Sequence, residues 1–557
     1  MRDMLMVCSA RFCLFGLLVT LWVSDGLGAE DRRPNIVFMM ADDMGVGNVS
    51  SYGTHDVLTP HIDRLAEEGI RFTDAHSPSA VCQPTRYAIL SGRGYWRSRW
   101  GRIQAGTYFR ENEVLLPRVL QEAGYATAMF GKWHLGHGWA EARGDRVNWN
   151  EPLTHGPNWA GFDYWFGMVN SHAQPPYVWI ENDGVYKHDP TDPMEIITHA
   201  EAAERGIQVR PDLPRWGVSV GAQAAHDALE MARLDLELAE RANRWIAERD
   251  PDQPFFLYVP FFAPHVPLAV AEEFRGSSPL AKRLGRSNNN AVRHADYCQQ
   301  LDHAVGMILD ALDAYGFADN TLVIFSSDNG AMNYADAQNL GFRSNGPFLG
   351  GKTQTWEGGH RVPFLARWLG RIPEGAVSDH LISLTDLYDT FMAVAGVDMP
   401  AGAGTDGLNI LPMWTDPADT SPIRRGMEYK GRDMGVRVGD WVFLPHQGAG
   451  GLASPGAPSR RLGFTNSDYD EDNQLRPDAP PGQLYNLVWD VSQSTNLFES
   501  EAELREELEA MWDAYLRSNH AQWHTEREKR NQQALHEFYE LLSEEAKARL
   551  WPAERWE

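Results

Sequence analysis

Cysteine and basic residues are scarce in this chain of 557 residues. Two of its four cysteines, Cys8 and Cys13, lie in an apolar N-terminal stretch. In the rest of the chain, a disulfide could form only between Cys82 and Cys298. Lys and Arg number 50 against 76 Asp and Glu, so the formal net charge is −26. Nucleic-acid binding depends on clustered basic residues, and this charge therefore argues against a nucleic-acid partner. An anionic ligand would need a local group of cations to attract it.

Long apolar runs are absent beyond the N-terminus. The run at 12–23 follows Arg2 and Arg11, precedes small residues up to Ala29, and is too short for a comfortable membrane span. This pattern predicts an export signal at residues 1–29, with a retained N-terminal anchor as the alternative. We therefore expect no stable membrane span in the mature chain and a secreted or periplasmic location.

Short continuous apolar runs are present at 35–40, 254–260 and 321–327, and each leads into polar residues. Such runs, flanked by helices, indicate strands of a parallel sheet that is buried on both faces. The sequence thus predicts an α/β layered fold with a large, mostly parallel central sheet. Apolar spacing predicts the flanking helices at 59–68, 113–123, 224–248, 295–315 and 385–395.

The length of the chain favours two structural units. We place the larger one at 30–405 and a smaller C-terminal α+β subdomain at 406–557. In the subdomain, strands are predicted at 436–444 and 483–487, and residues 445–482, rich in Gly, Pro, Ser and Asp, are predicted to form a long loop. Its helices are expected at 500–517 and 524–549.

One motif stands out. Residues 82–93 read Cys-Gln-Pro-Thr-Arg-Tyr-Ala-Ile-Leu-Ser-Gly-Arg. This Cys-x-Pro-x-Arg core with its Ser-Gly-Arg tail closely resembles the signature of the type I sulfatases. The resemblance implies an alkaline-phosphatase-like fold and oxidation of Cys82 to formylglycine, by a formylglycine-generating enzyme or an anaerobic sulfatase-maturating enzyme. The hydrated aldehyde attacks sulfur with one hydroxyl and releases sulfate with the other, which no standard side chain can do. Arg86 would hold and polarise this diol.

Hard oxygen ligands follow two of the predicted strands. Asp42 and Asp43 come after the first, and Asp328 and Asn329 come after the run at 321–327. Taken alone, each pair is more often a cap or a turn. The resemblance implies that these four residues, with modified Cys82, hold a divalent cation. Oxygen ligands suit Ca²⁺ or Mg²⁺ better than zinc, and we expect calcium, with magnesium as the alternative.

Three further segments resemble sulfatase motifs. Residues 131–136, Gly-Lys-Trp-His-Leu-Gly, match the second signature, which implies that Lys132 binds a sulfate oxygen and that His134 orients formylglycine. His265 follows the 254–260 run, and the role implied is proton donor to the leaving oxygen, shared with Lys352. Lys352 belongs to the block at 350–363 and would contact sulfate on the leaving-group side.

Substrate contacts are the least defined part of the sequence. Ser171 matches a serine near the diol in some relatives, and His172 and Arg361 are further candidates for substrate binding. Residues 95–102 mix aromatics with arginines, which suits a sulfated sugar, although pairing of these arginines with surface acids explains them equally well. The resemblance implies an exo-acting sulfatase of a sulfated carbohydrate, with a galactose- or N-acetylgalactosamine-type 6-sulfate as the expected ester.

Two other functions are compatible with the same scaffold. A phosphomonoester or phosphonate hydrolase would share the metal site, but phosphatases of this scaffold usually hold extra zinc through additional His and Asp residues, which we do not find. An inactive sulfate-binding protein would be expected to have lost one of the matched residues. Cys82, Lys132, His265 and Lys352 are all in place.

Overall fold

The computed structural model describes residues 32–98, 106–138, 141–142, 146–207, 217–285, 289–404, 406–418, 421–431, 433–450, 457–520 and 535–552. Residues Arg33–Glu557 form one compact unit, and Met1–Arg32 are a separate one. The predicted signal at 1–29 lies outside the described residues. Among the residues that are described, no helix combines the length and the apolar character needed to cross a membrane.

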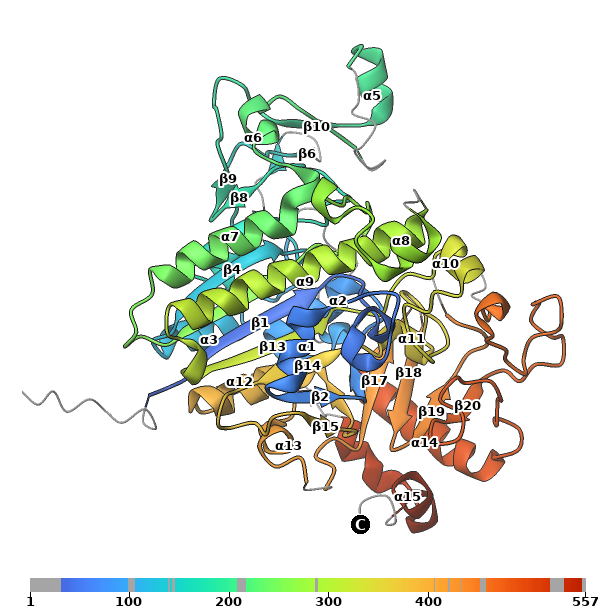
Figure 1. Ribbon diagram of the computed structural model, residues 1–557. Helices are drawn as coiled ribbons and strands as arrows, with labels where there is room; N and C mark the ends of the chain where they lie inside the picture. Colours follow the sequence, from blue (N-terminus) through green and yellow to red (C-terminus); the bar gives the residue numbers. More distant parts are fainter. Residues whose placement is uncertain are drawn as a thin grey trace, which may run out of the picture. The chain divides into compact units, whose positions relative to one another are not determined.

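A ten-stranded sheet forms the centre of the larger unit (Figure 1). Its strands are, in spatial order, β15 (Ala376–Ser378), β2 (Ile70–Phe72), β14 (Phe364–Arg367), β13 (Thr321–Ser327), β1 (Asn35–Ala41), β12 (Phe255–Pro260), β4 (Ala126–Lys132), β7 (Tyr164–Met168), β8 (Ile180–Glu181) and β9 (Gly184–Val185). The five strands from β13 to β7 are parallel, and antiparallel pairs flank them. The predicted, mostly parallel sheet is confirmed.

Strand β1 shows how both faces of this sheet are buried. Val37 and Met39 pack into a core with α1 (Pro60–Glu67), α7 (Leu234–Ala247) and α9 (Asn290–Ala314). The alternate residues Ile36, Phe38 and Met40 pack into a second core with α2 (Cys82–Ser91), α3 (Leu116–Glu122) and α12 (Leu387–Ala395). Because successive side chains of a strand point to opposite faces, a strand covered on both sides reads as an unbroken apolar run.

The helices differ from the expected ranges at their ends. The helix expected at 224–248 is divided into α6 (Gln223–Asp227), a short 3₁₀ turn and α7. Helix α9 begins at Asn290, five residues earlier than expected, because the side chain of Asn289 accepts a hydrogen bond from the amide of Val292 and caps the helix.

A second, four-stranded antiparallel sheet lies in the C-terminal part of the chain. Its strands are β17 (Gly426–Lys430), β18 (Met434–Val438), β19 (Trp441–Leu444) and β20 (Gln483–Asn486). The single strand expected at 436–444 is wrong. Gly439, with φ of 55°, turns the chain in a conformation that favours glycine, so this segment forms the β18–β19 hairpin. Within 524–549, the described part contains a 3₁₀ helix at Leu535–Leu541 and α15 (Glu544–Leu550).

The remaining elements are short except for one long C-terminal helix. Two-stranded pairs are β3 (Ala75–His76) with β16 (Ile382–Ser383), β10 (Glu195–Ile197) with β11 (Val218–Val220), and β5 (Glu141–Ala142) with β6 (Arg146–Val147). The other helices are α4 (Pro157–Ala160), α5 (His199–Glu204), α8 (Pro279–Leu284), α10 (Ala335–Leu340), α11 (Glu357–His360), α13 (Leu411–Thr415) and α14 (Ala502–His520).

Candidate active site

Four parallel strands deliver polar residues to one edge of the central sheet. Strand β1 is followed by Asp42 and Asp43, β13 by Asp328, β4 ends at Lys132, and the segment after β12 carries His265. The carboxyl ends of parallel strands meet at the same edge, where ligands collect in open α/β sheets. Helix α2 begins at the same place, with Cys82 as its first residue.

The acidic residues form one buried cluster. The amide of Asp43 donates to Oδ1 of Asp328 over 3.1 Å, and Nδ2 of Asn329 donates to Oδ1 of Asp43 over 2.8 Å. None of these side chains is more than 1% exposed, and Asp42 beside them is fully buried. Burial and the neighbouring charge of Asp42 raise the pKa of Asp328 to about 7. The cluster therefore needs positive charge to keep its carboxylates ionised together.

Each of the three carboxylates contacts its own cation. Lys132 Nζ lies 2.7 Å from Asp42 Oδ2, and both side chains are fully buried. Arg86 donates through Nη2 and Nε to Oδ2 of Asp328, over 2.7 and 3.0 Å. Lys352 Nζ lies 2.6 Å from Asp43 Oδ1.

The network shifts the pKa values of acidic and of basic side chains. Burial alone would raise the pKa of Asp42, but the charges of Lys132 and Arg86 hold it well below its usual value. Burial alone would lower the pKa of Lys352, but Asp43 raises it well above its usual value, so the ammonium group keeps its proton.

Cys82 lies within this network as a buried thiol. Its side chain is 4% exposed, and Sγ is 3.4 Å from Nδ1 of His134. Burial raises the pKa of the Cys82 thiol, despite the nearby charges of Lys132 and Lys352. Because the thiolate is the nucleophilic form of cysteine, this environment does not activate an unmodified Cys82.

Three non-glycine residues of the site have left-handed backbone conformations. They are Asp43 with φ of 70°, His134 with φ of 61° and Thr353, next to Lys352, with φ of 74°. Such conformations cost about 1–3 kcal/mol each and persist where the surroundings enforce them, which is common at functional sites. Their convergence here marks this edge of the sheet as the functional site.

His265 lies at the rim of the cluster. Its Nε2 is 3.7 Å from Asp43 Oδ2, and its Nδ1 is 3.4 Å from Ser171 Oγ. Burial and the charge of Lys352 lower the pKa of His265 to about 4, so the ring is neutral at neutral pH. His172 is fully buried, and its Nε2 donates to the carbonyl of Pro267 over 3.1 Å. It thus contacts the segment that carries His265.

Asp235 is a residue of this region that sequence reasoning missed. It is fully buried on α7, and its two carboxylate oxygens accept the amides of Phe262 and Ala263 over 2.7 and 3.1 Å. These amides lie two and three residues before His265. A single Asp in an amphipathic helix gives no sequence signal for such a role, since Asp is common on helix surfaces.

Two predicted contact residues have other partners. Arg361 donates to the carbonyl of Thr73 over 2.8 and 3.0 Å and to Glu357 over 2.9 Å. Arg97, in the 95–102 segment, forms a two-fold hydrogen bond with Asp406 over 2.7 Å. Arg99 and Arg102 lie outside the described residues.

The residues present fit a hard divalent cation. Oδ1 of Asp42 and Oδ1 of Asn329 are buried without a hydrogen-bond partner, which is costly for oxygens that are left without a ligand. One potential ligand atom from each of Asp42, Cys82 and Asp328 lies within 4.8 Å of the others. Carboxylate and amide oxygens are the ligands of calcium and magnesium, whereas zinc prefers His and Cys.

Comparison with known proteins gives one consistent family. The family model described as Sulfatase matches residues 34–397. The chain is 34% identical over 400 residues to N-acetylgalactosamine-6-sulfatase of Homo sapiens, covering 70% of this chain and 67% of that protein. It is 29% identical over 518 residues to N-acetylgalactosamine-6-O-sulfatase of Bacteroides thetaiotaomicron, covering 87% and 94%.

A similar solved structure is a Bacteroides thetaiotaomicron protein described with the metabolism of multiple glycosaminoglycans. It has a TM-score of 0.72 and 27% identity, and the match covers 87% of this chain and 99% of that one. The fold is that of the sulfatases, which is alkaline-phosphatase-like. Since the family model spans most of the chain and the signature residues converge at one sheet edge, the chain belongs to the type I sulfatase family and is a sulfuric ester hydrolase.

Proposed function

We propose that the protein removes a 6-sulfate from an N-acetylgalactosamine- or galactose-type unit at the end of a sulfated carbohydrate chain. The names of the relatives in Homo sapiens and Bacteroides thetaiotaomicron support this substrate class. The observation that carries the proposal is the position of Cys82, at the start of α2, among three buried carboxylates and the three cations that contact them.

The groups that the chain would acquire supply the reactive chemistry. Formylglycine made from Cys82 would supply a hydrated aldehyde, whose paired hydroxyls allow attack on sulfur and release of sulfate. A divalent cation, calcium by preference or magnesium, would supply positive charge for a sulfate oxygen. It would be held by Cys82, Asp42, Asp43, Asp328 and Asn329.

The chain's own residues have separate roles in this proposal. Arg86 is fixed by Asp328 and by the carbonyl of Lys132, at 2.9 Å, so its guanidinium orients the residue at position 82. His134, whose Nδ1 lies 3.4 Å from Cys82 Sγ, helps to orient the same residue. Lys132 and Lys352 place ammonium groups where charge develops on sulfate oxygens.

His265 would give a proton to the leaving sugar oxygen. Its pKa of about 4 reflects burial and the charge of Lys352. The negative charge of a bound sulfate ester opposes both effects, so substrate binding raises the pKa toward the range in which histidine is an effective acid. Ser171, at 3.4 Å from Nδ1, holds the ring in place.

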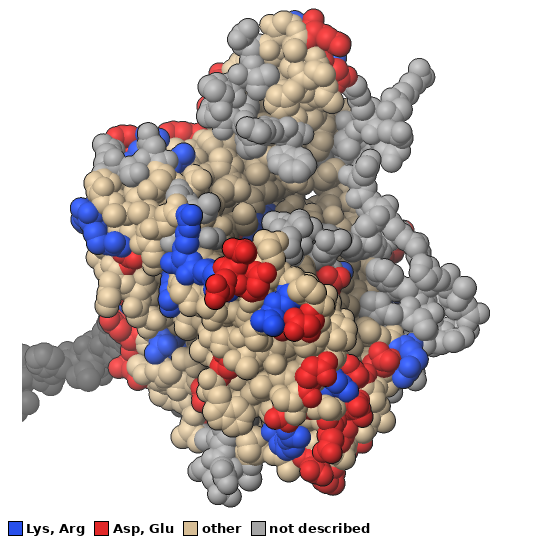
Figure 2. All heavy atoms as spheres, turned by 90° about the vertical axis from the view of Figure 1, so that its right-hand side faces the viewer, with Lys and Arg blue, Asp and Glu red and all other residues tan. Residues whose placement is uncertain are grey.

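Charge balance supports a sulfate ligand. The site contains three carboxylates and three cationic side chains, so its own side chains sum to zero. A bound dication would leave the site with a net positive charge, which favours the singly charged sulfate group of an ester. On the face of the molecule in Figure 2, acidic side chains gather in the lower part while basic ones are scattered. With a net charge of −26, the cations of the site and a bound metal must therefore attract the substrate locally.

The test is a screen of desulfation across defined sulfated mono- and oligosaccharides, scored by the position of sulfate loss. We expect turnover of 6-sulfated galactose-type units at chain ends, and slower turnover of the same unit inside a chain. Activity confined to another position or to internal units would contradict the substrate assignment. A phosphomonoester and a phosphonate ester, measured in parallel, test the other hydrolase function.

Three further features complete the proposal. Residues 1–29 direct export and are removed, residues 30–405 form the catalytic part, and residues 406–557 form the C-terminal subdomain.

The mature enzyme then acts in the periplasm or outside the cell. Its activity depends on a formylglycine-generating or anaerobic sulfatase-maturating enzyme. Mass spectrometry of the secreted protein tests export and cleavage at the N-terminus and oxidation at the Cys82 peptide.

A further inference from the structure

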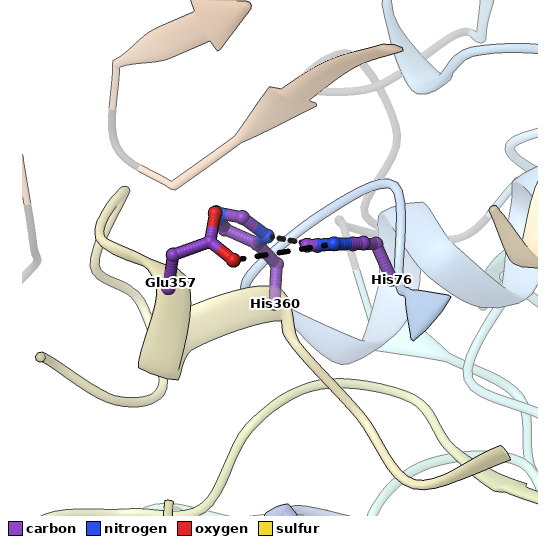
Figure 3. Close-up of side chains that lie close together, drawn as sticks. All are labelled: His76, Glu357 and His360. Atoms are coloured by element: carbon purple, nitrogen blue, oxygen red, sulfur yellow. Dashed lines mark hydrogen bonds and ion pairs between the residues drawn. The ribbon is translucent and has the colours of Figure 1, made fainter. Parts of the chain in front are cut away.

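Two buried histidines meet beside the loop that carries Lys352. His76 ends strand β3 and His360 ends helix α11, and their Nδ1 atoms are 2.9 Å apart (Figure 3). Both side chains are fully buried. The carboxylate of Glu357 points toward the same place, with Oε2 at 4.0 Å from His76 Nε2. A contact of 2.9 Å between two ring nitrogens is a hydrogen bond only if one of them carries a proton.

The outer nitrogen of His76 carries its own proton. His76 Nε2 lies 2.7 Å from Asp74 Oδ1, and Arg437 donates to both oxygens of Asp74 over 2.7 Å. Burial alone would raise the pKa of Asp74, but Arg361 and Arg437 hold it well below its usual value. An ionised carboxylate only accepts hydrogen bonds, so Nε2 of His76 is the donor. Arg437 Nη1, 3.2 Å from that nitrogen, donates to the same oxygen.

The outer nitrogen of His360 is protonated for the same reason. His360 Nε2 lies 3.3 Å from the carbonyl oxygen of Thr355, and a carbonyl oxygen has no proton to give. In neutral rings, both Nδ1 atoms would then present lone pairs to each other over 2.9 Å. Something positive must lie between them.

We propose that His76 and His360 share one additional proton between their Nδ1 atoms, and that this hydrogen bond positions two segments of the active site. The pair then carries a single positive charge. Burial lowers the pKa of His76, and it lowers that of His360 to about 3, so neither ring holds a second proton alone. The proton belongs to the pair, because its loss brings two lone pairs into contact.

A proton fits this space better than a metal ion does. Two imidazoles bound to a tetrahedral zinc at about 2.0–2.1 Å stand about 3.3 Å apart, which is wider than the 2.9 Å found here. The charges that face the pair are Asp74, Glu357, Arg361 and Arg437, and the ring of Tyr429 lies 3.9 Å from that of His360. The charges of these two carboxylates and two guanidiniums sum to zero. A shared proton therefore leaves one uncompensated charge in this buried place, whereas a dication would leave two.

The pair lies between the two segments that present Cys82 and Lys352. His76 precedes Cys82 by six residues, and the amide of Ser77 donates to the carbonyl of His360 over 2.8 Å. On the same path, the amide of Thr353 donates to the carbonyl of Ala80 over 2.7 Å. The positioning role rests on the proposed functions of Cys82 and Lys352, whereas the shared proton does not.

The first test is nitrogen-15 NMR of the mature protein labelled at histidine. We expect two rings that are both protonated at Nε2, and a shared proton far downfield that disappears in His360→Asn. Signals of one ring protonated at Nδ1 with a bare Nε2 would overturn the proposal. So would one equivalent of zinc that survives dialysis against chelator in wild type and is lost in His360→Asn.

The second test uses pH and a matched pair of variants. In His360→Asn, the amide nitrogen takes the place of Nδ1 and donates to His76 without an extra proton, whereas His360→Ala leaves no donor. Histidines of the unfolded chain lose their proton above about pH 6.5. Above that pH, the additional proton of the pair is bound only in the folded state. The folding constant of wild type should therefore fall relative to His360→Asn by about tenfold per pH unit from there up to the pair's own pKa. A constant ratio between pH 6 and 9 would refute the shared proton.

Turnover separates the positioning role from the proton itself. We expect His360→Ala to lower kcat with little change in KM at neutral pH, and His360→Asn to restore most of kcat. Equal kcat in all three proteins would overturn positioning by the pair. If instead Cys82→Ala kept full activity, the proposed function would fail while the NMR and pH results still decided on the proton.

Discussion

The ammonium group of Lys352 contacts both carboxylate oxygens of Asp43, at 2.6 and 2.7 Å. A lysine that served only to fix Asp43 would not need to remain 11% exposed at the rim of the site. We expect Lys352→Ala to lower kcat/KM for a sulfate ester by roughly 10²–10³-fold, as removal of a charged donor to a developing oxyanion does. Steady-state kinetics check this, with Lys282→Ala, an exposed lysine on α8, as the control. Full activity of Lys352→Ala would contradict its contact with sulfate.

Cys82 has a natural control in the chain. Cys82 and Cys298 are both free and buried, but only Cys82 lies among the acids and cations of the site. We expect Cys82→Ala to fold normally and to lose at least about 10⁴-fold in kcat, because no nucleophile remains. Cys298→Ala should keep its turnover and lose some stability to the cavity it creates. Circular dichroism and kinetics on both variants measure this, and a thiol found intact at position 82 in fully active protein would refute the mechanism.

Removal of divalent metal should lower both turnover and thermal stability. Asp42, Asp43 and Asp328 repel one another in a buried cluster, and a dication relieves this repulsion. Dialysis against a chelator should therefore reduce the midpoint of thermal unfolding. Recovery with calcium or with magnesium, titrated separately, identifies the preferred ion. An enzyme with unchanged activity and midpoint after chelation would argue against the metal site.

Asp235→Asn should impair catalysis from a distance. An amide offers one acceptor oxygen, and its NH₂ group opposes the second of the two backbone amides that Asp235 binds. We expect a loss of about 1–3 kcal/mol in stability and a fall in kcat with little change in KM, since His265 is displaced. Asp310→Asn, on the exposed face of α9, is the control.

The pH dependence of stability gives Asp235 a second readout. Burial raises its pKa to about 7, above the value of about 3.9 in an unfolded chain. The folded state therefore binds the proton more tightly, and wild-type stability declines as pH rises from about 4 to about 7. Asp235→Asn should lack this part of the decline. Parallel curves for the two proteins from urea unfolding would contradict a raised pKa.

Arg97 is expected to contribute to stability and not to substrate binding. Its guanidinium is buried against Asp406, and Arg97→Met would leave that carboxylate without its partner, at a cost of about 3–5 kcal/mol. Urea unfolding of Arg97→Met and of Arg97→Met/Asp406→Leu should show the loss and its partial recovery. Unchanged stability together with a raised KM would instead place Arg97 at the sugar.

The parallel centre of the sheet and the main site were predictable because the signals are local. Apolar runs such as 321–327 are long enough to define a buried strand, and the polar residues that follow them are fixed to one edge by the parallel arrangement. For the residues of the signature segments, resemblance to the sulfatase family was enough to predict that they form one site. The geometry brings Asp42, Cys82, Lys132, Asp328 and Lys352 together.

What sequence could not supply were contacts between distant segments. The missed turn at Gly439 and Asp440 is a different case, because Gly-Asp between two short strand-like runs is a local signal for a hairpin. The pairing of Arg97 with Asp406 joins residues 309 positions apart, and that of His76 with His360 spans 284. Neither partner is marked by spacing or composition, because such pairs are set by the packing of the whole fold.

The central strand obtains its neighbours late in the chain. Asn35, at the start of β1, bonds to Phe255 and to Thr321, which follow it by 220 and 286 residues. During synthesis, β1 and α2 therefore wait for more than half of the polypeptide before their sheet can close, and such non-local pairing is slow to form. Cys82 is almost sealed in the finished fold, so an enzyme that oxidises it, as the proposed function requires, would reach the thiol most easily during that interval. Under that proposal, the order of strands along the chain would set the time available for the modification.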